Sequence, residues 1–297
     1  MSNTLCILGC GNLGTAILQS LLTSTEPLFT HYIACVSSES SSQRLSTQFA
    51  SSLANQVTVS INDNVNSIQD SNVIILALDP SIIHHGLTQP GLREALDGKL
   101  LISVVAGWTR QKLEETLYGS ESTTENTNRA CIIRTLPNIA ALVSQSLTAI
   151  ETDLSHPIPE QHLSLAESIF SRIGKTIRVP PSLMDATTAV AGSTPAMFAI
   201  IADAMVDAAV AVGVPRAMAQ TMIFQAMQGT AGMLQSGVHP ALLKDQGTSP
   251  EGCTIGGVMV LEEGGVRGVV GRAVREAVTV ARGMDGKRHV NDTRGFP

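Results

Sequence analysis

Aromatic side chains are scarce in this chain, at 3% of its 297 residues, although hydrophobic residues make up 43%. Alanine, glycine and small aliphatic side chains must therefore fill most of the core, which favours closely approaching helices. Charged residues are also few, at 15%. Because disordered chains combine low hydrophobicity with high net charge, this composition indicates a folded protein with a substantial core.

Basic residues are too few for a continuous positive face: 19 lysines and arginines stand against 25 acidic residues, a net charge of −6. We expect no nucleic-acid partner, because phosphates need such a face. The five cysteines are scattered without a CxxC pair, and the histidines show no ligand-type spacing beside them. We therefore expect no metal site, and we expect the cysteines to be reduced.

We expect neither a targeting segment nor a membrane span in this sequence. The strand-like residues 4–8 lead straight into glycines, with no basic stretch, apolar run and cleavage site. The most apolar long window, residues 194–212, contains Asp203 and Asp207 four apart on one helical face. We predict a buried helix of a soluble, cytoplasmic protein there, and no membrane partner.

The first 180 residues alternate short apolar runs with helical patterns. Such runs predict parallel strands covered on both faces; they are residues 5–8, 33–36, 57–61, 73–78, 100–105 and 131–134. Residues 13–22 and 111–117 have helical patterns, and the polar residues 121–128 predict a surface loop. The alternation predicts an α/β fold, with a Rossmann-type doubly wound parallel sheet over residues 1–180.

Beyond Pro180 and Pro181 the pattern changes to long stretches rich in alanine, methionine and valine. Glycine and proline break them as helix stop and start signals do, leaving predicted helices over residues 184–191, 195–212, 215–236, 255–263 and 266–284. These helices are apolar on all sides, so we expect burial against a second subunit. Residues 181–285 are thus predicted to form an all-helical dimerisation and substrate domain, and residues 286–297 a flexible tail.

A glycine-rich loop follows the first predicted strand and opens the first predicted helix, with the sequence Gly9-Cys10-Gly11-Asn12-Leu13-Gly14. In this context GxGxxG predicts a dinucleotide-binding loop: Gly9 allows a tight turn, Gly11 lets backbone approach the pyrophosphate, and Gly14 lets helix and strand pack closely. The diphosphate then lies at the helix N-terminus, where free N–H groups favour an anion. The alternative is an ordinary glycine turn of an α/β protein.

The end of the second predicted strand bears on the choice between NADPH and NADH. An acidic residue there usually holds the ribose 2′-hydroxyl of NAD. Here Ser37 and Ser38 fill that place, and Arg44 can approach a 2′-phosphate. The balance favours NADPH, while Glu39 leaves NADH open and a plain solvated loop explains Arg44 almost as well.

Three later strands end in residues that would face the same crevice, where open α/β sheets bind ligands. These residues are Asp79 and Pro80, Ala106 and Gly107, and Asn138. Each of these residues is also common in ordinary loops. Their occurrence at the ends of three strands, behind a nucleotide loop, favours a role in the cofactor site.

The most specific stretch of the chain is Thr248-Ser249-Pro250-Glu251-Gly252-Cys253-Thr254-Ile255, with Leu261-Glu262-Glu263-Gly264-Gly265-Val266-Arg267 behind it. Together with residues 7–14, 132–138, 191–196, 213–216 and 239–245, it resembles the pyrroline-5-carboxylate reductase family over nearly the whole chain.

This resemblance implies a Rossmann domain and a helical domain that interlocks two subunits in a homodimer, with dimers able to assemble into a larger ring. Active sites would lie where the nucleotide crevice of one subunit meets the helices of its partner. The implied reaction is reduction of the cyclic imine 1-pyrroline-5-carboxylate to proline by NADPH or NADH. The resemblance also implies cofactor contacts from Ser38, Asn64, Leu78, Asp79 and Ala106, with Gln246 beside nicotinamide and substrate and Cys253 and Thr254 on the imino acid.

The turn over residues 249–254 has the chemistry that such a substrate needs. The nicotinamide supplies the hydride, so protein groups need only orient and polarise. Backbone N–H groups of the turn can bind a carboxylate. Thr254 is the candidate catalytic hydroxyl, which orients or relays the proton at the ring nitrogen; a helix N-cap explains it equally well. The predicted substrate-binding residues are Ser193, Thr194, Gln246, Ser249, Glu251, Gly252, Cys253 and Thr254.

Several residues depart from the family pattern, and most of them lie at the predicted pocket or cofactor site. Glycines of the family are replaced by Glu251 and Thr194, an acidic residue by Pro181, an asparagine by Gln246 and a lysine by Asp79. Three explanations stand: Glu251 takes over from the missing acid and contacts the ring nitrogen, the enzyme reduces a methylated or six-membered cyclic imine, or the changes are neutral.

Two functions of other kinds compete. A two-domain β-hydroxyacid dehydrogenase needs a lysine general acid–base early in the second domain, and residues 182–215 contain no lysine. A non-catalytic NADPH-sensing protein would keep the fold and lose the pocket chemistry. Lys244 with Asp245, Arg216 and Arg267 are interpreted as ion pairs or caps.

Overall fold

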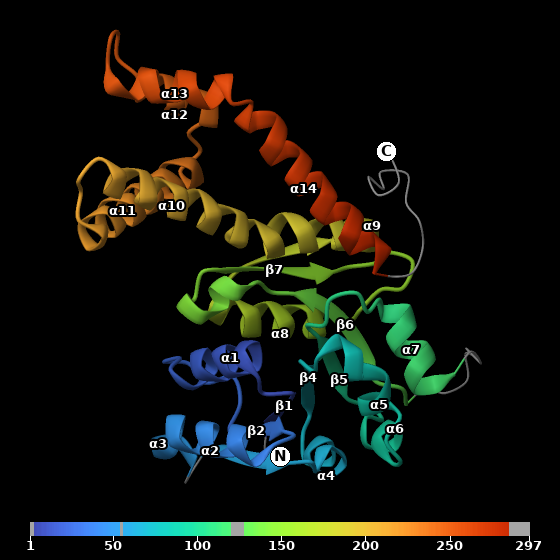
Figure 1. The fold of residues 1–297 in the computed structure, drawn as a ribbon. Helices are drawn as coiled ribbons and strands as arrows, with labels where there is room; N and C mark the ends of the chain where they lie inside the picture. The colour runs from blue at the N-terminus through green and yellow to red at the C-terminus, as the bar shows by residue number, and fades with distance from the viewer. Residues whose placement is uncertain (1–2, 54–55, 120–127, 285–297) are drawn as a thin grey trace. The chain divides into compact units, whose positions relative to one another are not determined.

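The computed structural model describes residues 3–53, 56–119 and 128–284 (Figure 1). The described chain divides into two compact units: a sheet unit, which comprises the residues up to Gly192 and residues 278–284, and a helical unit, Ser193–Ala277. The predicted boundary between residues 180 and 181 precedes this division and stays a prediction. The predicted flexible tail and nearly all of the predicted loop at residues 121–128 lie outside the described residues.

The sheet unit is built on one sheet of eight strands in the order β3-β2-β1-β4-β5-β6-β7-β8. The strands are β1 (Thr4–Leu8), β2 (His31–Val36), β3 (Val57–Ile61), β4 (Val73–Leu76), β5 (Leu100–Ser103), β6 (Cys131–Leu136), β7 (Ser146–Glu151) and β8 (Gly174–Val179). The first six pair in parallel, as predicted. Strands β7 and β8, which were not predicted, extend the sheet, and β7 runs antiparallel to β6. Only the short 3₁₀ segment η2 (Ile139–Val143) joins β6 to β7, and an antiparallel pair needs no longer crossover.

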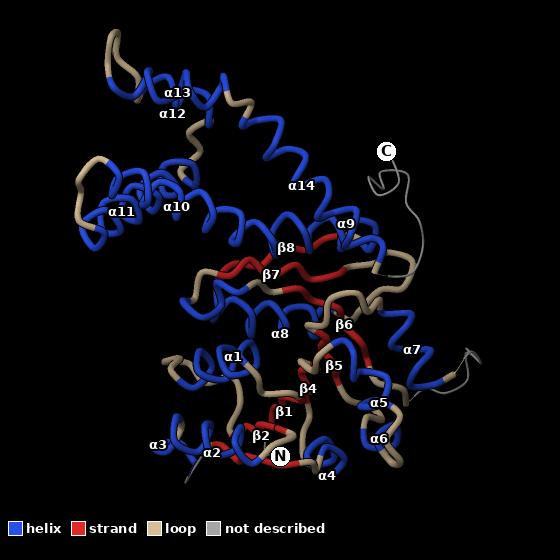
Figure 2. Tube along the Cα trace, in the orientation of Figure 1, coloured by secondary structure: helices blue, strands red, loops and turns tan. Residues whose placement is uncertain are grey.

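The core of the sheet unit covers both faces of this sheet, because successive strand residues point to opposite sides. Ile7, Ile75 and Ile102 contribute to the cluster on one face, and Cys6, Ile74 and Leu101 to the other. The first cluster takes in α1 (Asn12–Leu22), α2 (Glu39–Gln48) and α8 (Glu160–Phe170). The second takes in α4 (Asn64–Gln69), α5 (Ile83–Leu87), α6 (Leu92–Ala95) and α7 (Arg110–Tyr118), so that helices flank the sheet on both sides (Figure 2).

The described residues beyond 180 form helices joined by short connections, as predicted. They form α9 (Pro181–Thr187), the π-helical segment η4 (Thr188–Ser193), α10 (Thr194–Ala211), α11 (Arg216–Gln235), α12 (Pro240–Gln246), α13 (Cys253–Glu263) and α14 (Val266–Gly283). Helix α12 was not predicted, because Pro240 looks like a break. In the structure Pro240 is the first residue of the helix and His239 caps it, a position where proline loses no hydrogen bond.

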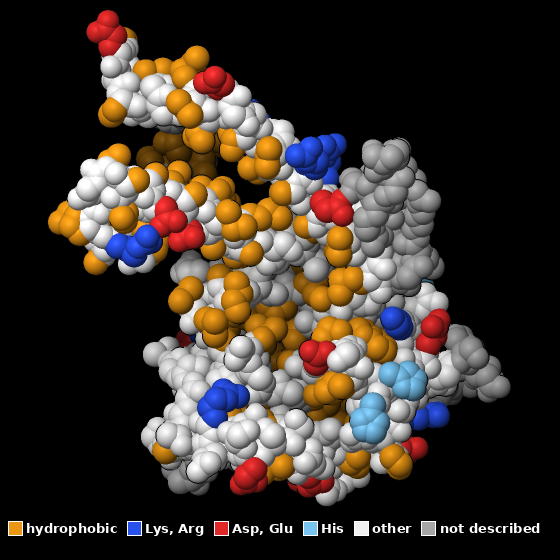
Figure 3. Space-filling model, viewed as in Figure 1, with side chains coloured by type: hydrophobic (Ala, Val, Ile, Leu, Met, Phe, Trp, Pro, Cys, Tyr) orange, Lys and Arg blue, Asp and Glu red, His pale blue; other side chains and the backbone are white. Residues whose placement is uncertain are grey.

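The expectation that residues 194–212 form a buried helix is wrong for the single chain. Only Ala202 and Val206 of α10 are buried, whereas Ile200 is 72% exposed. Figure 3 shows hydrophobic side chains spread over the surface of the helical unit. The run Pro181–Ala211 is long and apolar enough to cross a membrane by length and composition, a test that helices covered by another protein surface also pass.

Candidate functional site

The glycines of the loop are under the steric constraints that the sequence predicts. Gly9 has a φ of +88°, and a Cβ on it would lie 2.6 Å from the carbonyl oxygen of Ala77. A Cβ on Gly14 would lie 2.9 Å from the carbonyl oxygen of Gly9. A Cβ on Gly11 would have no described atom within 4 Å. Two of the glycines are therefore required by packing, and the third faces open space in front of the loop.

The loop is held so that the start of α1 stays available. The N–H groups of Gly9 and Cys10 both donate to the carbonyl of Cys35, at 3.2 and 2.8 Å. Helix α1 begins at Asn12 with Gly11 as its N-cap, and no described side chain accepts from its first turn. These free N–H groups form the kind of site where helices bind anions.

A cleft of about 430 Å³ opens beside this loop. It lies where the strand order reverses, between β1 and β4, which is the ligand position in open α/β sheets. The predicted cofactor residues that line it are Gly9, Cys10, Gly11, Ser37, Asn64, Leu78 and Asp79. Sequence reasoning missed other lining residues, including Ser41, Asn62, Ile82, His85 and Gln89, since no motif marks them.

Serine hydroxyls occupy the end of β2, as predicted. Ser38 caps α2 by accepting from the N–H of Ser41 at 3.3 Å, and Asn62 donates to the carbonyl of Ser37. Arg44 does not extend toward this end of the cleft. Its guanidinium donates to the carbonyl of Cys10 at 3.0 Å and so braces the glycine loop from outside the cleft. This corrects the expectation that Arg44 approaches a 2′-phosphate.

The loop after β4 is fixed by local hydrogen bonds. Asp79 caps the 3₁₀ segment η1 (Pro80–Ile82) and accepts from the N–H and hydroxyl of Ser81, at 2.9 and 2.6 Å. These bonds lower the pKa of Asp79 below its usual value, so it stays ionised. The carbonyl of Pro80 accepts from the indole of Trp108 at 3.2 Å, which connects this loop to the one after β5.

Gly107 and Asn138, predicted at the same crevice, have packing roles in the structure. Gly107 has a φ of +74°, and a Cβ on it would lie 3.1 Å from the side chain of Met284. The Asn138 amide donates to the carbonyl of Ala191 at 2.8 Å, while its oxygen accepts from Ala140. Asn138 thus ties the end of β6 to the π-helical segment, and its cofactor contact stays a prediction.

The predicted substrate turn has an unusual backbone. The N–H of Gly252 donates to the carbonyl of Ser249 at 3.1 Å across Pro250 and Glu251. Glu251 has a φ of +58°. Proline followed by a residue of positive φ is the pattern of a type II turn, whose third residue is normally glycine. Placing glutamate there costs about 1–2 kcal/mol of backbone strain, which explains why the family pattern has a glycine.

Thr254 is not the cap of α13, which corrects one of its two interpretations. Gly252 is the N-cap, the helix begins at Cys253, and no described side chain accepts from its first turn. A Cβ on Gly252 would lie 2.5 Å from the hydroxyl of Ser249, so only glycine fits. Cys253 and Thr254 are exposed, with the Thr254 hydroxyl in the first turn beside uncapped N–H groups.

The remaining predicted substrate residues lie at helix ends. Gln246 ends α12, Ser193 ends the π-helical segment, and Thr194 begins α10. The π-helical segment itself was not predicted, although such segments are frequent at functional sites. The predicted ion pairs are confirmed: Lys244 pairs with Asp245, Arg216 with Asp207 at 2.6 Å, and Arg267 with Glu262 at 2.8 Å.

Two family models match the chain. One, described as a coenzyme F420-dependent NADP oxidoreductase, matches residues 4–107. The other, described as pyrroline-5-carboxylate reductase dimerisation, matches residues 181–284 and begins at the predicted domain boundary. Together they agree with a Rossmann-type domain followed by a helical dimerisation domain.

Several pyrroline-5-carboxylate reductases resemble the chain over nearly its whole length. It is 41% identical to the pyrroline-5-carboxylate reductase of Lophium arboricola, over 98% of this chain and 96% of that protein. The solved pyrroline-5-carboxylate reductase of Coxiella burnetii matches with a TM-score of 0.78 and 25% identity, over 95% of this chain and 98% of that one. The Plasmodium falciparum pyrroline carboxylate reductase, solved with NADP bound, has the same fold, with a TM-score of 0.77, 23% identity and the same coverage.

Proposed function

The chain belongs to the pyrroline-5-carboxylate reductase family, and on this premise we propose that it reduces 1-pyrroline-5-carboxylate to proline with NADPH. The observation that carries the proposal is the presence, in one chain, of two uncapped helix N-termini with different surroundings. One follows the glycine loop at α1 and the other follows the Ser249–Gly252 turn at α13. The first suits a dinucleotide diphosphate and the second a small carboxylate.

The residues of the cleft fit the cofactor. The open space in front of Gly11 allows the pyrophosphate to approach the backbone N–H groups of α1. The hydroxyls of Ser37 and Ser38 lie at the ribose end, where they donate to a 2′-phosphate and favour NADPH over NADH. Asn64, which lines the cleft, holds the adenosine side. When bound, NADPH supplies the hydride that the imine carbon accepts.

The residues of the turn act on the imino acid. The N–H groups of the first turn of α13 bind its carboxylate, and Ser249 and Gly252 keep that turn in shape. Thr254 holds the proton at the ring nitrogen through its hydroxyl, so that the nitrogen of the product amine is protonated as the carbon gains its hydride. Gln246, Ser193 and Thr194 complete the pocket in this proposal.

The protein is a homo-oligomer, since the dimerisation model spans helices whose apolar side chains are exposed in the single chain. We extend this to interlocked helices, with each active site combining the cleft of one subunit with the helical unit of its partner, and to dimers assembled into rings. Light scattering of the purified protein measures the assembly. We also propose a cytoplasmic location, which microscopy of the tagged full chain tests.

A second candidate is reduction of a methylated or six-membered cyclic imine. The observation that favours it is Glu251, which brings a negative charge and a strained backbone to a position where the family has glycine. The charge lies beside the N–H groups proposed to bind the substrate carboxylate. A larger or methylated ring would place the same carboxylate at a different distance from this charge.

The test is a steady-state assay of NADPH oxidation by the purified protein. The substrates are 1-pyrroline-5-carboxylate, its methylated analogues and piperideine carboxylate. We expect the highest kcat/KM with 1-pyrroline-5-carboxylate. Preference for another imine supports the second candidate, and NADPH binding without turnover of any imine contradicts both and leaves a sensing role.

A further inference from the structure

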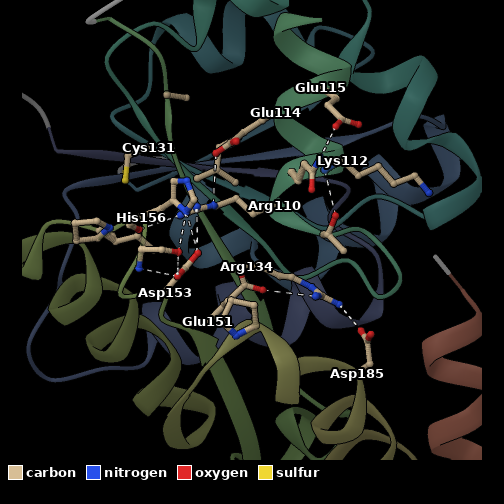
Figure 4. A pocket seen from close by; sticks show the side chains of 18 residues that line it. Arg110, Lys112, Glu114, Glu115, Cys131, Arg134, Glu151, Asp153, His156 and Asp185 are labelled. Carbon is tan, nitrogen blue, oxygen red and sulfur yellow. Dashed lines mark hydrogen bonds and ion pairs between the residues drawn. The ribbon is translucent and has the colours of Figure 1, made fainter. Parts of the chain in front are cut away.

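The sheet unit contains another cavity, of about 980 Å³, which the proposed reaction does not use. It lies between α7, the first residues of β6, the end of β7 with the loop that follows, and α9 (Figure 4). Volumes of this order are typical of small-molecule sites. Its lining shares no residue with the nucleotide cleft or with the predicted substrate residues.

Three ion pairs of this cavity are longer than a hydrogen bond. Arg110 lies 3.5 Å from Glu114 and 3.7 Å from Asp153. Arg134 lies 3.6 Å from the carboxylate of Glu151. Hydrogen bonds between N–H and oxygen measure about 2.7–3.2 Å. Asp153 instead accepts from the N–H and hydroxyl of Ser155 and bonds the ring of His156. Arg110 donates to the carbonyl of His156 at 3.2 Å. Glu114 and Glu151 are the carboxylates that face a guanidinium group from beyond hydrogen-bond distance.

Two ion pairs elsewhere in the sheet unit are shorter. On its surface, Arg178 reaches Glu160 at 2.6 Å and Glu167 at 2.7 Å. Arg178 lies on β8, so a side chain of the sheet can form ion pairs at hydrogen-bond distance. The long distances at Glu114 and Glu151 therefore leave these two carboxylates available to a third group.

The charged groups at the inner wall of the cavity are buried, so hydrogen bonds that they do not make cost free energy. Arg134 is 3% exposed, and its Nε has no hydrogen-bond partner among the described residues, although its Nη2 donates to Asp185 at 3.0 Å. Burial raises the pKa of Glu151 even though Arg134 acts to lower it. Buried charges are stable only when their hydrogen bonds are made.

Acid outweighs base around this space. Four carboxylates, from Glu114, Glu151, Asp153 and Asp185, surround the guanidinium groups of Arg110 and Arg134.

The other charged lining residues are committed elsewhere. Lys112 lies over the ring of Trp108 at 4.6 Å, and Glu115 accepts from Gln111 at 2.7 Å. In the described part of the chain no group of three or more acidic, histidine or cysteine side chains could hold a metal ion. The surplus of two negative charges thus calls for an organic cation.

We propose that this cavity binds an α-amino acid with a cationic side chain, of the arginine or ornithine type. Its ammonium group and its side-chain cation pair with the surplus carboxylates. Its carboxylate accepts from Arg110, whose side chain is 16% exposed and so can be reached from solvent. Such a ligand carries two positive groups and one negative group, the inverse of the ratio of charges in the lining.

The test is calorimetric titration of the full chain with L-arginine, without NADPH or imine, so that its outcome is independent of the proposed reaction. We expect saturable binding of one L-arginine per chain. L-Glutamate, which carries the opposite side-chain charge, should bind at least about tenfold more weakly. No saturable binding of L-arginine, or equal binding of the two amino acids, overturns the proposal.

Two variants locate the site. Glu114→Gln, at the solvent-exposed rim, and Glu151→Gln, at the inner wall, should each weaken L-arginine binding about tenfold by removing one charged partner. Glu94→Gln, on an exposed position of α6, is the matched control and should bind as the unmodified chain does. Thermal melting and NADPH affinity verify that each variant is folded. If both cavity variants bind L-arginine normally, the ligand is elsewhere and the proposal fails.

Discussion

Replacing Gly11 by alanine should separate cofactor binding from stability. Gly11 has an ordinary φ of −76°, and its added Cβ meets no described atom within 4 Å. An alanine compatible with its backbone stabilises a protein by about 0.4–1 kcal/mol, because the unfolded chain loses freedom. The variant should therefore melt at the same temperature as the unmodified protein or slightly higher.

The same methyl group lies in the space that the pyrophosphate needs to reach the N–H groups of α1. Losing charge-assisted hydrogen bonds there costs about 1.5–3 kcal/mol. This corresponds to a rise of about 10- to 150-fold in the Kd for NADPH. Titration of NADPH fluorescence measures the Kd, and a thermal melt of the same sample measures stability.

Gly9→Ala is the matched control, because its methyl group should lower the stability of the protein through backbone strain and a steric clash. At a φ of +88° an alanine costs about 1–2 kcal/mol, and its Cβ would lie 2.6 Å from the carbonyl of Ala77. This variant should melt at least about 2–4 °C lower. The reasoning is refuted if Gly11→Ala binds NADPH with normal affinity, or if it lowers the melting temperature as much as Gly9→Ala does.

Three further perturbations probe other parts of the molecule. Glu251→Gly should lower KM for 1-pyrroline-5-carboxylate without loss of thermal stability, because it removes a negative charge beside the turn and glycine adopts a φ of +58° freely; a higher KM would instead indicate contact with the ring nitrogen. Asn138→Ala should cost about 1–3 kcal/mol in chemical denaturation, because it leaves the carbonyl of Ala191 without its donor; unchanged stability would contradict that role. Hydrogen bonds from Ser155 lower the pKa of Asp153 to about 2, so its contribution to stability is present at neutral pH and lost as the pH falls through about 2. Asp153→Asn should therefore melt below the unmodified protein at pH 7, with a gap that closes by about pH 2; a gap that persists in acid would exclude this origin.

Strands β1, β2 and β4, which lead into the nucleotide cleft, could be predicted because nearly all of their residues are buried and each contains an apolar run. Strands β7 and β8 gave no such signal, because polar residues interrupt both: β7 has the sequence Ser-Leu-Thr-Ala-Ile-Glu and β8 the sequence Gly-Lys-Thr-Ile-Arg-Val. The glycine loop was predicted together with its spatial constraints. The bracing role of Arg44 could not be, because it depends on how α2 packs against the loop rather than on sequence spacing.

The turn at Glu251 has a backbone conformation that could not be predicted from the sequence. A missing glycine was visible in the pattern, but the positive φ that makes it consequential was not. The charged cavity had no local signal at all. Its carboxylates and guanidinium groups come from α7, β6, β7 and α9, and the fold alone brings them together.

The most direct test of the central claim follows the hydride itself. The purified protein is incubated with 1-pyrroline-5-carboxylate and NADPH deuterated at the transferable position of the nicotinamide, and the product is identified by mass spectrometry. We predict proline that carries the deuterium on the former imine carbon, formed in step with NADPH oxidation. Absence of proline, or proline without the label, would contradict the account.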